Sequence, residues 1–241
     1  MISTGEIAVF VASTADPGPP PSADQSLLSP EETARAARFY FDKDRDLFVL
    51  GKRMTRTLVG RELGLDPAAL VFAAGQRGKP ALAGPAADSG LTFNLAHSGT
   101  CVYVALARAR RLGVDVEFGR PEIECVELGR RFFCEAEIAL LEAGPPDETR
   151  RLFFKFWTLK EAYLKAEGSG LGISLTAMDA SGVPDAPLSP PMTPVEDEPR
   201  GILVQRLDAP VGYAAAVAAD GGAWTTRVSA WRARDFAASA T

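Results

Sequence analysis

Two acidic residues alternate with valines in the segment 113–117, and their spacing could hold a metal ion. Asp115 and Glu117 share one face of a predicted strand, because alternate side chains of a strand point the same way. Gly113 lies on that face too and is expected to leave space beside the carboxylates. Neighbouring carboxylates repel each other unless a cation lies between them, and Mg²⁺ prefers oxygen ligands. The segment is therefore a candidate magnesium site; the alternative is the solvated edge of a hairpin.

A second group of candidate residues lies in the helical pattern from Phe156 to Lys165, where residues four apart share a face. Trp157, Glu161 and Lys165 form one stripe of that helix. An exposed Glu161–Lys165 pair would stabilise the helix by only about 0.3–0.5 kcal/mol. The segment is rich in aromatic residues, which favours a mostly buried helix whose Glu and Lys face a cleft. The alternative is a solvated helix face.

His97 and Lys79 are candidate phosphate ligands. His97 is the only histidine of the chain and follows a predicted strand. Its imidazole and the adjacent backbone N–H groups can donate hydrogen bonds to a phosphate; the alternative is a structural or exposed histidine. Lys79 lies between Gly78 and Pro80. A lysine in such a rigid turn can bind a phosphate as a point charge, and the alternative is an ordinary turn.

Short strands and longer helices must position these side chains. Ser29 and Glu32 flank a proline in a helix start signal, and leucines at helical spacing predict another helix over 44–63, which Gly64 ends. The basic turn 108–111 is predicted to join two strands into a hairpin. The predicted strands cover 7–11, 70–73, 91–94, 101–107, 112–117, 202–207 and 211–219, and the later helices cover 125–131, 134–141 and 148–166.

Length and composition indicate a folded protein of one or two domains. The chain has 241 residues, a formal charge of −5 and 46% hydrophobic residues. It is too apolar for a disordered chain and too acidic for a nucleic-acid binder that works by bulk positive charge. Three cysteines without C-x-x-C spacing fit free thiols in a reducing compartment. We expect neither a signal peptide nor a membrane span, and we predict a soluble cytoplasmic protein.

A weak internal echo suggests a duplication. Residues 212–219 are similar in composition to residues 101–108, and each segment lies late in its half of the chain. Two similar α+β halves meeting face to face would explain the echo. The alternative is that any two strands rich in alanine and valine look alike.

Taken in order along the chain, the motifs resemble the 4′-phosphopantetheinyl transferases of the Sfp type, the class with two similar halves. The resemblance extends from about Arg35 to Leu171. The motifs are G-K-P at 78–80, N-L-A-H-S at 94–98, G-V-D-V-E at 113–117, F-F-x-x-x-E at 132–137, F-W-T-L-K-E-A-Y-L-K at 156–165 and G-x-G-L at 168–171.

The resemblance implies an α+β fold, a pseudo-twofold duplication with the active site in the cleft between the halves 1–110 and 111–241. Such enzymes transfer the 4′-phosphopantetheine arm of coenzyme A (CoA) to a serine of an acyl or peptidyl carrier protein. The reaction depends on Mg²⁺ and releases adenosine 3′,5′-bisphosphate. Because one chain carries both halves, we expect a monomer.

The resemblance also assigns roles to the candidate residues. Asp115, Glu117 and Glu161 would hold Mg²⁺ together with the pyrophosphate of CoA. Lys165 would contact that pyrophosphate, with Lys160 nearby. A carboxylate must accept the proton of the carrier serine; Glu161 is the first choice for this base and Glu117 the second. The sequence does not separate the base from the metal ligands.

The nucleotide end of CoA, including its 3′-phosphate, would lie against His97 and Lys79. Two positions depart from the family pattern. Ala96 stands where relatives often have serine, and the helix near residue 44 has Leu47, Phe48 and Val49 where relatives commonly offer an arginine. Arg45 is therefore the predicted substitute, with Lys43 and Arg35 as further candidates.

A carrier protein is typically acidic, so an enzyme of charge −5 needs a local docking patch. The candidate patch consists of Arg130, Arg131, Arg150 and Arg151, and the alternative is ordinary surface arginines. The alternative function is a catalytically degenerate carrier-binding module, which the joint presence of the three carboxylates and Lys165 disfavours. A different magnesium-dependent phosphotransferase is disfavoured as well, because no G-x-x-x-x-G-K-[ST] loop is present.

Overall fold

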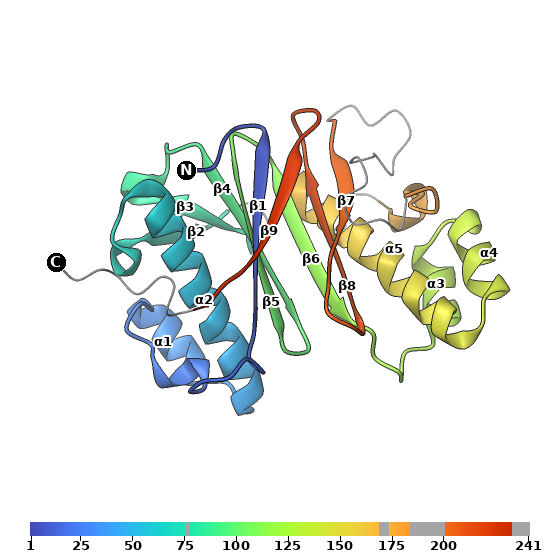
Figure 1. Cartoon of the computed structure of the whole chain (residues 1–241), viewed down its shortest axis with the longest axis horizontal. Helices are drawn as coiled ribbons and strands as arrows, with labels where there is room; N and C mark the ends of the chain where they lie inside the picture. Colours follow the sequence, from blue (N-terminus) through green and yellow to red (C-terminus); the bar gives the residue numbers. More distant parts are fainter. Residues whose placement is uncertain (76–77, 169–173, 184–200, 233–241) are drawn as a thin grey trace.

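The computed structural model describes residues 1–75, 78–168, 174–183 and 201–232. Helices and two main sheets form an α+β fold in which the sheets lie in the middle and the helices on the outside (Figure 1). Residues 169–171 of the G-x-G-L motif fall outside the described residues, as do residues 184–200, which are rich in proline. No helix of the described part is long and apolar enough to cross a membrane.

The first sheet has the order β4-β5-β1-β9. Strand β5 pairs antiparallel with β4 and β1, and β9 pairs parallel with β1. The 22-residue helix α2 covers this sheet and ends at Gly64, whose left-handed conformation suits glycine. The elements are β1 (Glu6–Ser13), α1 (Pro30–Ala36), α2 (Asp42–Leu63), β4 (Leu91–Ser98), β5 (Cys101–Arg108) and β9 (Thr225–Ala230). A small hairpin adjoins them: β2 (Val71–Ala74) and β3 (Pro80–Ala83).

The second sheet has the antiparallel order β6-β8-β7. Its alanine-rich central strand lets α5 pack closely, because small side chains on one face of the strand belong to the core beneath that helix. Helix α5 also has 22 residues and ends at a left-handed glycine, Gly168. The elements are β6 (Leu112–Phe118), α3 (Cys125–Phe132), α4 (Glu135–Ala143), α5 (Pro146–Glu167), β7 (Leu203–Leu207) and β8 (Tyr213–Ala219).

The two sheets pack on each other through a shared apolar core. Ile7, Val9 and Tyr103 of the first sheet meet Val114 and Val217 of the second, and all five are buried. Each sheet therefore buries both faces, one against the other sheet and one against its helices (Figure 1). The strands of the predicted echo, β5 and β8, occupy the centres of the two sheets.

The predicted hairpin over residues 101–117 is wrong. Strands β5 and β6 follow each other in sequence but belong to different sheets, and β6 pairs with β8, with Asp115 opposite Ala216. The physical reason is burial on both faces of β6: its valines face the first sheet, and its acidic face is covered by α5. Asp115 is therefore only 4% exposed, which excludes the solvated-edge interpretation.

Most other predicted elements are confirmed, with modest changes in length. Ser29 and Glu32 form a reciprocal capping box at the start of α1. Strand β4 extends four residues beyond its predicted end and includes His97. Strand β9 was not predicted, because most of its side chains are exposed and its hydrophobic alternation is weak. It returns the chain from the second sheet to the edge of the first.

Candidate active site

The acidic face of β6 lies directly against α5. Gly113 allows this contact, because a Cβ atom at that position would overlap the carbonyl oxygen of Ala162. The expectation that Gly113 leaves space for a ligand is therefore wrong: the helix backbone fills that space. The close approach of the helix brings Lys165 against Asp115.

Asp115 is the most buried member of the site. Its Oδ1 accepts a hydrogen bond from Nζ of Lys165 at 2.6 Å, and the same ammonium donates to the carbonyl of Val114 at 3.3 Å. Its Oδ2 is buried and has no hydrogen-bond partner among the described residues. Burial raises the pKa of Asp115 to about 7; Lys165 opposes this shift, and Glu117 and Glu161 reinforce it. Lys165 thus pairs across to β6, a contact that helical spacing alone did not predict.

Glu117 and Glu161 lie at the more open side of this cluster. Glu117 accepts a hydrogen bond from the hydroxyl of Ser98 at 2.7 Å, and Arg120 lies 3.8 Å away. Burial raises the pKa of Glu161, Lys165 lowers it, and Glu117 raises it further. These mutual effects show that the three carboxylates of β6 and α5 share one electrostatic environment.

Two hydrogen bonds cross from the N-L-A-H-S motif to the G-V-D-V-E motif. The amide oxygen of Asn94 accepts from the backbone N–H of Val114 at 2.8 Å. Ser98 donates to Glu117, as above, and its hydroxyl also accepts from the backbone N–H of Phe118 at 3.1 Å. The first sheet therefore fixes the position of β6. Sequence reasoning assigned no role to Asn94 or Ser98, although both belong to the recognised motif.

The donor set suits a hard divalent cation. All three side chains offer carboxylate oxygens, and the unpartnered Oδ2 of Asp115 is a buried acceptor that a cation would satisfy. However, the carboxylate oxygens of Asp115, Glu117 and Glu161 do not all lie within 4.8 Å of one another. Among the described residues the group that meets this distance is Cys134, Glu137 and Asp179. In that group the ammonium of Lys160 already neutralises Glu137.

His97 faces a basic cavity of about 490 Å³ beside the acidic cluster. Arg35, Lys43 and Arg120 line the same cavity, together with aromatic side chains from α2, from the segment before α2 and from the end of β6. Desolvation lowers the pKa of His97, as does Lys165, whereas Glu117 and Asp44 raise it. The predicted ligand Arg45 is not among the lining residues; its guanidinium lies 2.6 Å from Asp42 on the same helix. Arg35 and Lys43 occupy the position that was expected of Arg45.

Lys79 bridges the two halves of the chain. Its ammonium donates to the carbonyl of Leu112 at 2.7 Å and to the carbonyl of Lys165 at 2.6 Å. Burial lowers its pKa to about 8, and the charge of Lys165 contributes. Lys79 lines a separate cavity of about 370 Å³ with Arg110 and Arg111, so the structure does not bring it into the cavity of His97.

Lys160 lies outside the carboxylate cluster. It is fully buried, and its Nζ lies 2.5 Å from Glu137 and donates to the carbonyl of Leu175 at 2.8 Å. Its predicted place beside the pyrophosphate of CoA does not fit this position. The predicted arginine patch also has local partners: Arg130 pairs with Glu142, and Arg150 and Arg151 pair with acidic residues one turn away.

Comparison with known proteins covers both halves of the chain. Residues 111–218 match the family model described as the 4′-phosphopantetheinyl transferase superfamily, and residues 22–109 match the model of the 4′-phosphopantetheinyl transferase N-terminal region. The 4′-phosphopantetheinyl transferase HetI of Nostoc sp. is 39% identical over 168 residues, which is 67% of this chain and 71% of HetI.

Two further relatives show lower identity. The 4′-phosphopantetheinyl transferase Sfp of Bacillus subtilis is 33% identical over 151 residues, 62% of this chain and 64% of Sfp. The L-aminoadipate-semialdehyde dehydrogenase-phosphopantetheinyl transferase of Pongo abelii is 30% identical over 161 residues, 63% of this chain and 52% of that protein. The paired motifs, the two packed sheets and these matches together establish that the chain belongs to the 4′-phosphopantetheinyl transferase superfamily and to its Sfp type.

Proposed function

We propose that this transferase moves the 4′-phosphopantetheine arm of CoA onto a serine of an acyl or peptidyl carrier protein and releases adenosine 3′,5′-bisphosphate. The observation that carries the proposal is a buried acidic cluster beside a basic cavity. The acidic cluster contains Asp115, which has one unpartnered oxygen. The basic cavity is lined by His97, Arg35 and Lys43. CoA carries a pyrophosphate, which needs a metal near carboxylates, and a 3′-phosphate, which needs cations.

Asp115, Glu117 and Glu161 would hold Mg²⁺ in this site. When bound, Mg²⁺ neutralises the negative charge of the pyrophosphate and of the leaving bisphosphate. Lys165 is close enough to exchange partners: its ammonium now lies 2.6 Å from Asp115 and would turn to the pyrophosphate once a cation satisfies that carboxylate.

Glu161 is our choice for the base that accepts the proton of the carrier serine. Burial raises its pKa, and a carboxylate of raised pKa is a better proton acceptor near neutral pH. Glu117 is the second choice, because Ser98 already donates a hydrogen bond to it. The nucleophile belongs to the carrier, so the chain itself needs no nucleophilic serine.

The nucleotide end of CoA is assigned to the basic cavity of His97. Its volume of about 490 Å³ and its mixture of cationic and aromatic side chains suit a phosphorylated nucleoside. Lys79 remains a predicted contact for this end of CoA, although its ammonium would have to share two carbonyl partners with the ligand. Arg45 is retained only as a contact that movement of its side chain away from Asp42 would permit.

We further propose a division into halves at residues 1–110 and 111–241, with β9 as a strand that the second half returns to the first sheet. The described site draws on β4, β6, α2 and α5 of one chain, which favours a monomer. A cytoplasmic location fits the three free cysteines. Nucleic acid and membrane play no part in the proposed reaction.

A catalytically degenerate carrier-binding module is the second candidate, because Lys165 occupies Asp115 and the three carboxylates do not close on one another. Intact-mass spectrometry of an apo carrier protein, incubated with the chain, CoA and Mg²⁺, separates the two functions. We expect a mass increase of one phosphopantetheine that EDTA abolishes. An unmodified carrier across several carrier classes, with CoA still bound to the chain, would support the binding module instead.

A further inference from the structure

Each half of the molecule has a buried cation, paired with a glutamate, at the same position of its longest helix. Helices α2 and α5 each have 22 residues and each end at a left-handed glycine, Gly64 and Gly168. Eight residues before that glycine stands a buried cation in both cases: Arg56, 2% exposed, and Lys160, 0% exposed. Buried cations are rare unless they are paired, so their equal placement in two halves is a specific similarity.

Each cation pairs with a glutamate that also caps the preceding helix. Nε of Arg56 lies 2.8 Å from Oε2 of Glu32, and the same oxygen accepts the backbone N–H of Ser29 at 3.0 Å. In the second half, Nζ of Lys160 lies 2.5 Å from Oε2 of Glu137. That oxygen accepts the backbone N–H of the cap residue Cys134, also at 3.0 Å. One carboxylate oxygen thus joins two helices in each half.

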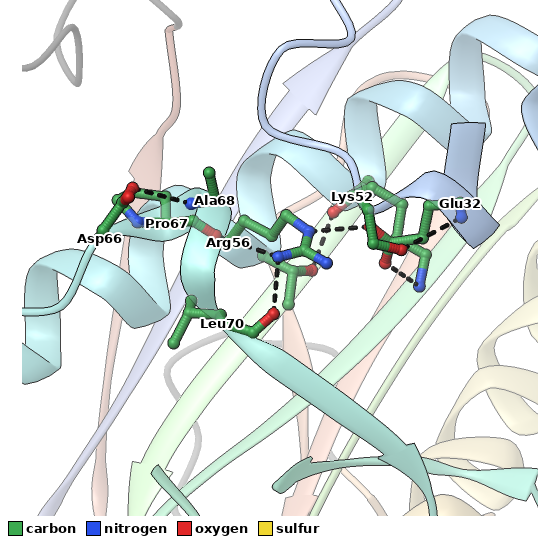
Figure 2. A network of polar contacts seen from close by, with 10 residues as sticks. Glu32, Lys52, Arg56, Asp66, Pro67, Ala68 and Leu70 are labelled. Carbon is green, nitrogen blue, oxygen red and sulfur yellow. Dashed lines mark hydrogen bonds and ion pairs between the residues drawn. The ribbon is translucent and has the colours of Figure 1, made fainter. Parts of the chain in front are cut away.

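Each cation also holds a segment that follows its helix. Arg56 donates to the carbonyls of Pro67 and Leu70 at 3.0 and 2.9 Å. Figure 2 shows its guanidinium between these carbonyls and Glu32. Lys160 donates to the carbonyl of Leu175 at 2.8 Å. Every donor interaction therefore links the long helix to a different part of its own half.

The two helices that the Arg56–Glu32 pair joins also carry cations of the basic cavity. Helix α1, which Glu32 joins to α2, carries Arg35, and α2 itself carries Lys43; both side chains line that cavity. Lys52 of α2 reinforces the joint at 3.2 Å from Glu32 (Figure 2). The relative position of the two helices therefore decides how far apart the cations of the cavity stand.

The helix that carries Lys160 also carries residues of the acidic cluster. Lys160 is the sequence neighbour of Glu161, on the helix whose Lys165 reaches Asp115. Glu137 extends the network, because its Oε1 accepts the backbone N–H of Ala180 at 2.9 Å. Lys160 is thus fastened to α4 and to the 175–180 segment, which opposes rotation or sliding of α5 over β6.

We propose that Arg56–Glu32 and Lys160–Glu137 are equivalent positioning pairs, of which the first sets the geometry of CoA binding and the second sets the geometry of the catalytic carboxylates. The proposal rests on the proposed function. A buried pair is costly to form but strongly constrains geometry, because removal of one partner leaves the other charge unsatisfied. The two pairs therefore differ in what they position, although they are built alike.

Matched substitutions in the two halves test this division. Lys160→Met is expected to lower kcat at least tenfold and to leave the metal-free affinity for CoA, measured by calorimetry, within about twofold. Arg56→Met is expected to weaken the metal-free affinity for CoA about tenfold and to leave kcat within about twofold. Lys160→Arg and Arg56→Lys keep the charge and should recover part of each loss. Arg227→Met, which breaks a surface pair with Glu6, serves as the control and should change neither quantity.

The opposite result is clear. If Lys160→Met and Arg56→Met lower kcat and the metal-free affinity for CoA in the same proportion, following only their loss of thermal stability, the pairs are structural and the proposal is overturned. If either methionine variant does not fold, Glu137→Gln and Glu32→Gln replace it, since both amides still accept a hydrogen bond. The same split between kcat and the metal-free affinity for CoA is then required.

Failure of the proposed function would be recognised separately, because the wild-type chain itself would then transfer nothing. Amide hydrogen exchange and calorimetric CoA binding still decide the positioning proposal in that case. We expect Lys160→Met to speed exchange over residues 161–166 without weakening CoA binding measured without Mg²⁺. We expect Arg56→Met to weaken that metal-free binding about tenfold without speeding the exchange. Equal changes in both variants would contradict the proposal.

Discussion

The two halves share a framework, but the side chains that they present at the candidate site carry opposite charges. In the first half, α1 and α2 present Arg35 and Lys43 to a cavity that His97 completes. In the second half, β6 and α5 present carboxylates, with Asp115 nearly buried. Under the proposed function, the two halves would bind the two ends of one anionic ligand differently, directly through cations in the first half and through a metal in the second. The comparison predicts separate effects for substitutions in the two halves.

The largest expected effect is on the acidic side. Asp115→Asn removes the buried charge that would bind Mg²⁺, and we expect the transfer rate to fall on the order of 10²-fold or more. The folded state should not lose stability, because the wild-type carboxylate is buried with one oxygen unpartnered. Transfer kinetics and thermal unfolding measure the two effects. Near-normal turnover would remove Asp115 from the metal site.

Gly113→Ala tests the contact that builds the acidic side. The added methyl group would overlap the backbone of α5 at Ala162 and Ala166. Overpacking of this kind typically costs about 1–3 kcal/mol of unfolding free energy, and displacement of α5 should lower the transfer rate as well. Chemical denaturation provides the measurement. Gly182→Ala provides the control, because no described atom lies within 4 Å of a Cβ atom added there. Equal stability of the two variants would contradict the close packing of β6 on α5.

On the basic side, we expect a loss of affinity rather than of rate. His97→Ala removes a donor of the cavity and should weaken CoA binding about tenfold, with kcat nearly unchanged. Arg45→Ala is the matched control, because that side chain pairs with Asp42 and does not line the cavity. Calorimetric titration with CoA distinguishes them. Equal weakening of CoA binding in both variants would indicate that Arg45 also contacts CoA. It would contradict the distinction between cavity residues and surface residues.

The smallest expected effect concerns the bridge between the halves. Burial lowers the folded-state pKa of Lys79 to about 8 from an ordinary value of 10.5. Between these pH values the unfolded chain binds more protons than the folded chain, so this group increases stability as pH rises from about 8 to 10.5. The unfolding free energy of the wild type relative to Lys79→Met should therefore increase over that range. A constant difference in denaturant titrations would argue against a buried ammonium.

Local patterns were sufficient to place the candidate ligands on shared faces of a strand and a helix, but not to predict the neighbours of these side chains. Asp115 and Glu117 were placed on one strand face because alternation is a local property, and Glu161 and Lys165 on one helix face for the same reason. The partner strand of β6 is separated from it by about a hundred residues. A short turn between two apolar runs therefore predicted a hairpin that does not form.

Burial explains the remaining differences. Helical spacing does not reveal that Lys160 faces Glu137 on α4, whereas Lys165 faces Asp115 on β6. Both lysines belong to one motif, and only tertiary packing separates their roles. Gly113 is a similar case. It was predicted to leave space beside the carboxylates, but the backbone of α5 fills that space. In both cases the decisive neighbour is a distant segment of the chain, about which local sequence says nothing.

The most direct test of the account is the effect of Mg²⁺ on CoA binding to the wild type and to Asp115→Asn, measured by titration calorimetry. We expect Mg²⁺ to tighten binding to the wild type by about tenfold or more, because the metal joins the carboxylates to the pyrophosphate. In Asp115→Asn the metal-free affinity should be kept and the gain from Mg²⁺ lost. An equal gain from Mg²⁺ in both proteins would contradict the assignment of the metal to the acidic face of β6.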